Sequence, residues 1–231
     1  MPETSPEPTP LVHRAVRSGG VIIAIAALQF LVAMILVEQH YSGYSFSANY
    51  ISDLGGVHSP WALLFDGSVI ALGVLAIPAI LLIWSAFDAR PARSVGLLLL
   101  VVAGVGAICV GVFPETTHVL SGKAHELASG VTFLGGALGL LVLFFAMRQP
   151  DRWRVSGPYT FLSGAVSLVA TVLLGVGSEW TIPRLYLGLG HGGMEWLIAG
   201  PLLLWMFVEG IHIGLLHRFA PGLVTPHVTS T

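Results

Sequence analysis

The residues best suited to chemistry in this chain stand in short polar segments between long apolar runs. They carry imidazole, carboxyl, hydroxyl or amide groups, and they are Asn49, Ser52, Asp53, Asp66, Glu115, His118, His125, His191 and Glu195. Such groups can ligate a metal ion, transfer a proton or hydrogen-bond a polar ligand. His191 and Glu195 are four residues apart and would share one face of a helix. We therefore take these residues as candidates for one polar pocket.

A zinc site is one interpretation of the same residues, because two or three histidines with a carboxylate can hold zinc and activate a water molecule. Its candidate ligands are His125, His191, Glu195 and Asp66. This combination is similar to that of the zinc-dependent lipid amidases of the seven-helix ceramidase and receptor superfamily. This chain, however, has only six apolar runs and lacks an HxxxH motif near its end. We expect no metal or other cofactor, with zinc as the alternative.

The segment NYISDLG, residues 49–55, is the most unusual of the polar stretches. As a helix it would place Asn49, Ser52 and Asp53 on one face and its apolar side chains on the opposite face. The glycine that ends the segment, and the glycine after it, would terminate such a helix. The pattern predicts a short interfacial helix that forms a lid or rim over the pocket.

Composition identifies the elements that must position these residues. The chain is 55% hydrophobic and 10% charged, with a mean hydropathy of +0.84, whereas soluble domains carry roughly 25% charged residues. Apolar runs of about 20 residues, enough to span a bilayer as helices, occur at approximately 19–38, 61–86, 94–113, 125–147, 157–176 and 192–216. We therefore predict an all-α polytopic membrane protein with a six-helix bundle over residues 18–218. We expect residues 1–17 to be disordered and residues 219–231 to form a cytoplasmic tail.

Basic residues predict the orientation of the bundle. Eight of the ten lysines and arginines fall on one side of the predicted spans, namely Arg14, Arg17, Arg90, Arg93, Arg148, Arg152, Arg154 and Arg218. Lys123 and Arg184 fall on the other side. The positive-inside rule then places both termini in the cytoplasm and the polar pocket at the outer face of the cell membrane. The formal net charge of -2 suggests no nucleic-acid partner.

Four segments together resemble a known family: NYISDLG at 49–55, GVFPE at 111–115, the histidine at 125 and MEWLIAGPLLLW at 194–205. They resemble the bacterial and archaeal membrane proteins known as domain of unknown function 998, over about residues 18–218. The resemblance implies six helices and points to Asn49, Ser52, Asp53, Pro114, Glu115 and His125 as shared positions.

The chain departs from the pattern of that family at two positions. The family usually has aspartate where this chain has Glu115, and a Glu-Arg pair where it has Glu195 and Trp196. The missing arginine implies another hydrogen-bonding partner for Glu195. The layout of the family is also similar to that of the lipid-linked Frag1/DRAM/Sfk1 group, a likeness of fold that gives little information on function.

Three functions are consistent with these patterns. The first is a membrane protein without enzymatic activity that binds a lipid or a membrane partner at an outward-facing pocket, and it is the one we favour. The second is an intramembrane metal-dependent hydrolase acting on lipid. The third is a small-solute transporter, which fits least well because transporters usually place their carboxylates on broken helices near the bilayer midplane.

Overall fold

The computed structural model describes residues 10–87, 89–147 and 153–216, and within them every regular element is helical. The long helices are α1 (Pro10–His40), α2 (Ala62–Leu82), α3 (Pro91–Val112), α4 (Ala124–Phe144), α5 (Ser156–Glu179) and α6 (Gly190–Ile211). All six are long and apolar enough to cross a membrane. The short elements are η1 (Ser52–Gly55), η2 (Trp84–Ala86), η3 (Val119–Gly122), η4 (Pro183–Tyr186) and a π-helical turn, η5 (His212–Leu216).

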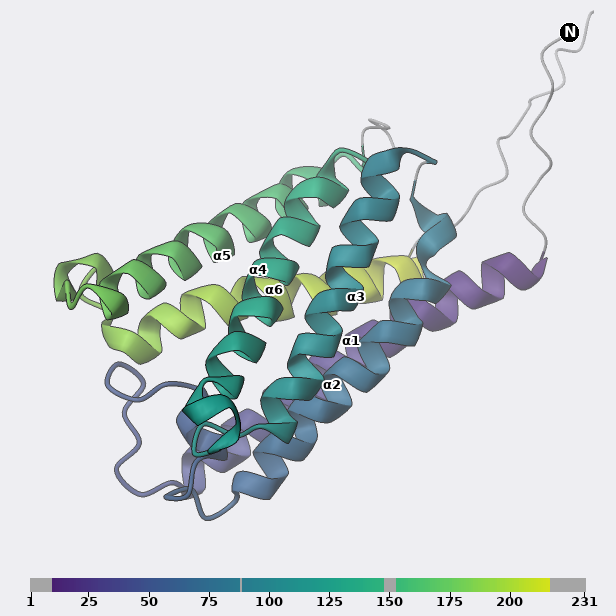
Figure 1. Ribbon diagram of the computed structural model, residues 1–231. Coiled ribbons are helices and arrows are strands. Elements are labelled where there is room, and N and C mark those ends of the chain that lie inside the picture. The colour runs from purple at the N-terminus through teal and green to yellow at the C-terminus, as the bar shows by residue number, and fades with distance from the viewer. Residues whose placement is uncertain (1–9, 88, 148–152, 217–231) are drawn as a thin grey trace, which may run out of the picture.

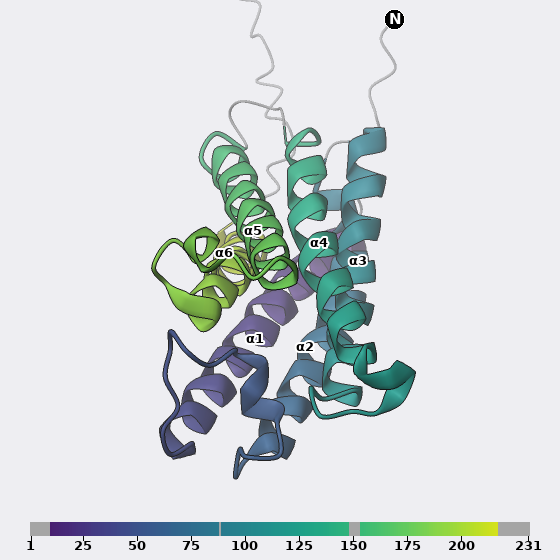
Figure 2. The same ribbon diagram turned by 60° about the vertical axis from the view of Figure 1, so that its left-hand side comes forward.

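The six helices form one bundle in which each helix packs against its neighbours in the chain, and α6 packs back against α1 (Figure 1). Connections 41–61, 113–123 and 180–189 lie at one end of the bundle, here named the loop end. The opposite end, where α1 begins, is named the terminal end. Figure 2 shows α5 on the outside of the bundle, beside α4 and α6.

The predicted spans are all present, with ends that differ by a few residues except in α1. This helix begins at Pro10 instead of near residue 19, so residues 10–17 are helical and not part of a disordered segment. Val16 is only 2% exposed and packs in the core, which shows why the helix continues beyond its most apolar stretch. Residues 1–9 and the predicted tail at 219–231 lie outside the described residues.

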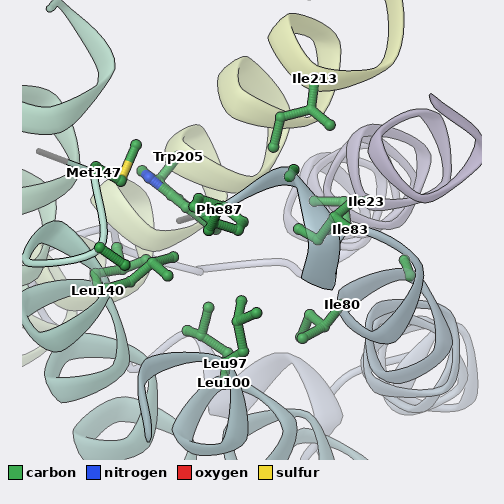
Figure 3. Packing of buried hydrophobic residues seen from close by; sticks show 14 of the residues in the cluster. Ile23, Ile80, Ile83, Phe87, Leu97, Leu100, Leu140, Met147, Trp205 and Ile213 are labelled. Carbon is green, nitrogen blue, oxygen red and sulfur yellow. The ribbon is translucent and has the colours of Figure 1, made fainter. Parts of the chain in front are cut away.

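The largest buried cluster lies toward the terminal end of the bundle, and Figure 3 shows it from close by. Phe87 and Trp153 stack with ring centroids 5.2 Å apart and an interplanar angle of 5°. Trp205 reaches this cluster from α6 and donates its indole N–H to Thr160 Oγ1 at 2.8 Å. These aromatic contacts join α5, α6 and the connection after α2, which closes the bundle at this end.

Candidate functional site

The segment predicted as a short helix over residues 49–55 is helical only at Ser52–Gly55, the 3-10 helix η1, and Asn49 lies before it. Side-chain hydrogen bonds hold this segment together. Asn49 donates its amide N–H to Asp53 Oδ2 at 2.9 Å, and the backbone N–H of Tyr50 donates to the same oxygen at 3.0 Å. Asn49 Oδ1 in turn accepts the backbone N–H of Ser45 at 3.0 Å. An acidic side chain that reaches back to the N–H three residues earlier resembles one half of a capping box. Asp53 therefore fixes the start of η1.

Glu195 connects this loop to α6. It is 6% exposed, and its Oε2 accepts the backbone N–H of Ile51 at 2.5 Å, across 144 residues of sequence. The backbone N–H of Ser52 also donates to the Glu195 carboxyl group. A buried carboxylate needs such partners, because leaving it unpaired in an apolar setting is costly. The hydrogen-bonding partner of Glu195 is thus the loop backbone.

Glu115 and Asp53 form a carboxyl pair beside the lid. Their side chains are hydrogen-bonded to each other, which requires one of the two groups to carry a proton. Partial burial, the hydrogen bond to Asp53 and the negative charge of Asp53 raise the pKa of Glu115 from 4.5 to about 7. Below about pH 7 the protonated form of Glu115 is favoured, and its O–H can then donate a hydrogen bond to the Asp53 carboxylate. The structure places the Asn49, Asp53 and Glu115 side chains together at the loop end.

Tyr50 connects this cluster to the start of α6. The sequence patterns did not point to this tyrosine. The His191 ring lies between two tyrosines, with centroids 5.4 Å from Tyr50 and 4.6 Å from Tyr186. Burial, followed by the nearby Tyr186 and the three carboxyl groups of Glu195, Glu115 and Asp53, raises the pKa of Tyr50 to about 12. The Tyr50 hydroxyl stays protonated at neutral pH and remains a hydrogen-bond donor.

The other candidates have separate positions. His125 is buried at the start of α4, where its Nδ1 donates to the carbonyl oxygen of Phe113 at 2.9 Å. Asp66 lies on α2 directly against Gly55 of η1, so closely that a Cβ on this glycine would collide with its carboxyl oxygen. His118 is exposed at the start of η3.

The predicted zinc ligands therefore do not converge. His125 bonds the end of α3, His191 lies between tyrosine rings, Glu195 bonds the loop backbone, and Asp66 faces a glycine. Within residues 10–87, 89–147 and 153–216, histidine, cysteine, aspartate and glutamate form no group of three or more that could hold a metal ion. In the described part of the chain, the four candidate ligands thus contact different partners and are not grouped around one point.

Glycines at the start of α6 allow the loop to approach it, a role that the glycine-rich sequence alone did not reveal. A Cβ at Gly192 would collide with the backbone carbonyl oxygens of Asn49 and Phe46. Gly190 has a φ of +72° and lies against Ser47, whose carbonyl oxygen accepts the Gly192 N–H at 3.3 Å. The loop backbone thus packs directly on the backbone of α6.

Beneath the lid lies a narrow, mainly apolar cavity of about 150 Å³. Residues of α1, α2, α3, α4 and α6 line it, while none of its lining residues comes from α5. Ile51 and Ser52 of the loop and Glu195 of α6 close it at the loop end, and Ile80, Leu140 and Trp205 line the deeper part. The same two loop residues that bond Glu195 therefore form one end of the cavity.

A second polar cluster lies at the terminal end of the bundle. His212 Nδ1 is 3.1 Å from Glu209 Oε2 and 3.0 Å from Ser156 Oγ. Both contacts fall on the same ring nitrogen, whereas a nucleophilic relay needs the serine and the carboxylate on opposite nitrogens. This arrangement ties α5 to the end of α6, and it is not a catalytic triad.

The fold and the site together define a polytopic helical membrane protein whose bundle encloses a narrow apolar cavity closed by a loop. A family model described as protein of unknown function, DUF998, matches residues 24–212. The chain therefore belongs to the DUF998 family, as its sequence motifs predicted. No curated protein and no solved structure matches the chain.

Proposed function

We propose that this protein binds one hydrocarbon chain of a membrane lipid in the central cavity, with the polar end of the lipid at the loop end. The observation that carries this proposal is the shape and lining of the cavity. Its α2 wall runs from Phe65 to Ile80, which is 15 residues at about 1.5 Å each, or roughly 22 Å. A volume of about 150 Å³ is that of a benzene-sized apolar group, so it accommodates a short part of the hydrocarbon chain, and a chain along the whole α2 wall requires the lining side chains to move apart.

The distribution of polar groups along the cavity supports an amphiphilic ligand. The ionisable lining residue is Glu195, and the hydroxyl groups are those of Ser52, Ser129 and Thr132, all in the half nearer the loop. The deeper half is lined by aliphatic and aromatic side chains such as Leu140. A ligand with one polar end and one apolar tail satisfies both halves, because buried polar groups need hydrogen-bonding partners and apolar walls do not.

The loop that contains η1 is the natural entrance for such a ligand. Ile51 and Ser52 close the cavity while their backbone N–H groups bond Glu195. Release of these bonds would open the cavity toward the Asp53–Glu115 pair. We further propose that this end faces the outside of the cell, because five described arginines lie at the terminal end, namely Arg14, Arg17, Arg90, Arg93 and Arg154.

The hydrolase and the transporter have less support. A metal-dependent hydrolase lacks a convergent ligand set among the described residues. A solute or proton route would need polar groups through the deeper half of the cavity, and its lining residues there are apolar.

A cavity-filling variant tests the proposal. Native mass spectrometry of the full chain in mild detergent should detect one retained lipid per protein. Ala107 is 3% exposed and lines the cavity, so Ala107→Phe should displace the lipid. Val105 on the same helix is 49% exposed and does not line the cavity, so Val105→Phe is the matched control that should retain the lipid. Equal lipid retention in both variants would overturn the proposal.

A further inference from the structure

A second hollow lies on the outer, lipid-facing side of α1 and α2, separate from the central cavity. It is a groove of about 580 Å³, formed only by these two helices. Its rim carries exposed apolar residues such as Leu28 at 47% and Val32 at 48%, and Ala33 and Gly67 lie among its lining residues. The space beside Gly67 is open among the described residues, since a Cβ there would meet none of their atoms within 4 Å.

Gln29 adds a polar group to this apolar groove. Its Nε2 donates to the carbonyl oxygens of Ala26 at 3.1 Å and Ser68 at 2.9 Å, so both amide protons are used. Among the described residues, none donates to its Oε1. Gln29 stands twelve residues after Arg17 and eleven before His40, so it lies near the middle of the membrane-spanning part of α1. The groove therefore presents an unsatisfied acceptor deep in the bilayer.

Lipid cannot satisfy this acceptor, because hydrocarbon tails carry no hydrogen-bond donor and an unpaired polar group there is costly. A donor at this depth must come from another protein helix, and glutamine is one of the residues that hydrogen-bond across helices in membranes. When two copies are related by a two-fold axis normal to the membrane, their two Gln29 side chains lie at the same depth in the bilayer. An amide is self-complementary, because it has both donors and an acceptor. Each Gln29 can release its N–H from the Ala26 carbonyl oxygen and donate it to Oε1 of the other Gln29.

We infer that the α1–α2 groove is the interface of a homodimer, with Gln29 of each copy hydrogen-bonded to Gln29 of the other. The apolar rim of one copy then fills the groove of the other, and Leu63, which is 88% exposed at the edge of the groove, becomes covered. This interface does not involve the central cavity, so it is independent of the proposed lipid binding.

Cysteine cross-linking in membranes tests the interface. The native cysteine is first replaced by Cys109→Ala in the full chain. Val32→Cys in the groove should then form a disulfide-linked dimer under mild oxidation, and Val169→Cys, 58% exposed on α5, should not. Cross-linking to a different protein, or equal dimer yield at both sites, would overturn the inference.

Two further variants separate the interface from folding. Gln29→Leu should weaken dimerisation by about three- to thirty-fold in a detergent dilution series. Gly67→Leu should block the groove without a clash inside one copy, whereas Gly130→Leu on α4, also at an open position, should leave the dimer intact. A monomer at all concentrations, or a dimer unaffected by Gly67→Leu, would contradict the inference.

Discussion

At the scale of single residues, Glu195 links the cavity to its lid. Its carboxylate is buried in a membrane-spanning helix and accepts two backbone N–H groups from the loop. These donors cannot rotate away or be replaced by solvent while the loop remains closed. The partnership therefore gives Glu195 a structural role, and it explains why a carboxyl group is tolerated at this depth.

Removal of the acceptor should loosen the loop. Glu195→Ala leaves the N–H groups of Ile51 and Ser52 without their partner, a loss of roughly 1–3 kcal/mol, which corresponds to a lowering of Tm by about 2–4 °C per kcal/mol. Glu195→Gln retains an acceptor oxygen and should change Tm much less. Thermal unfolding in detergent measures both, with Glu126→Ala, at an exposed position on α4, as control. Equal effects of Ala and Gln at position 195 would show that charge, not hydrogen bonding, matters there.

The Asp53–Glu115 pair makes a separate prediction about pH. The pKa of Glu115 is raised to about 7 in the folded protein, so between pH 4.5 and 7 the native state binds more protons than the unfolded state. The contribution of Glu115 to the free energy of unfolding should therefore be largest below about pH 4.5, and it should fall as pH rises through about 7. Glu115→Gln should remove this part of the slope in Tm against pH. An unchanged slope in the variant would show that Glu115 does not hold the proton.

At the scale of elements, contact between the loop and α6 depends on glycine. Gly192→Ala places a methyl group against the carbonyl oxygens of Asn49 and Phe46. These are backbone atoms, so they cannot move aside as easily as the end of a flexible side chain. The variant should lower Tm and increase protease cleavage or amide exchange within residues 45–54. Gly200→Ala on the same helix meets nothing within 4 Å, and it should be neutral or slightly stabilising, because alanine favours a helix over glycine by about 0.5–1 kcal/mol. Similar behaviour of the two variants would argue against loop packing on α6.

Sequence predicts the elements of this protein better than the contacts between them. Hydropathy locates all six spans, because each must satisfy its own backbone in lipid. The partner of Glu195 could not be found in this way, since the donors are backbone N–H groups that have no side-chain signature and lie 144 residues away. The partner of His125 was hidden for the same reason: its Nδ1 donates to the backbone carbonyl oxygen of Phe113, which likewise has no side-chain signature.

At the scale of the whole molecule, the two ends of the bundle differ in chemistry. The loop end carries the carboxyl pair, the tyrosines around His191 and the lid over the cavity. The terminal end carries the aromatic core around Trp153 and the Glu209–His212 contact. A lipid that enters at the loop end would meet polar groups first and a closed, apolar end last, which suits binding better than passage through the membrane.

Orientation in the membrane decides which compartment supplies the ligand, and it can be measured directly. In a Cys109→Ala background, Lys123→Cys is placed at the exposed end of the α3–α4 connection and Ala89→Cys at an exposed position between α2 and α3. If the arginine-rich side is cytoplasmic, a membrane-impermeant thiol reagent applied to intact cells should label only Lys123→Cys. Both variants should react after the membrane is permeabilised, which controls for local accessibility. Labelling of Ala89→Cys alone in intact cells would reverse the orientation and place the lid, the carboxyl pair and the entrance to the cavity in the cytoplasm.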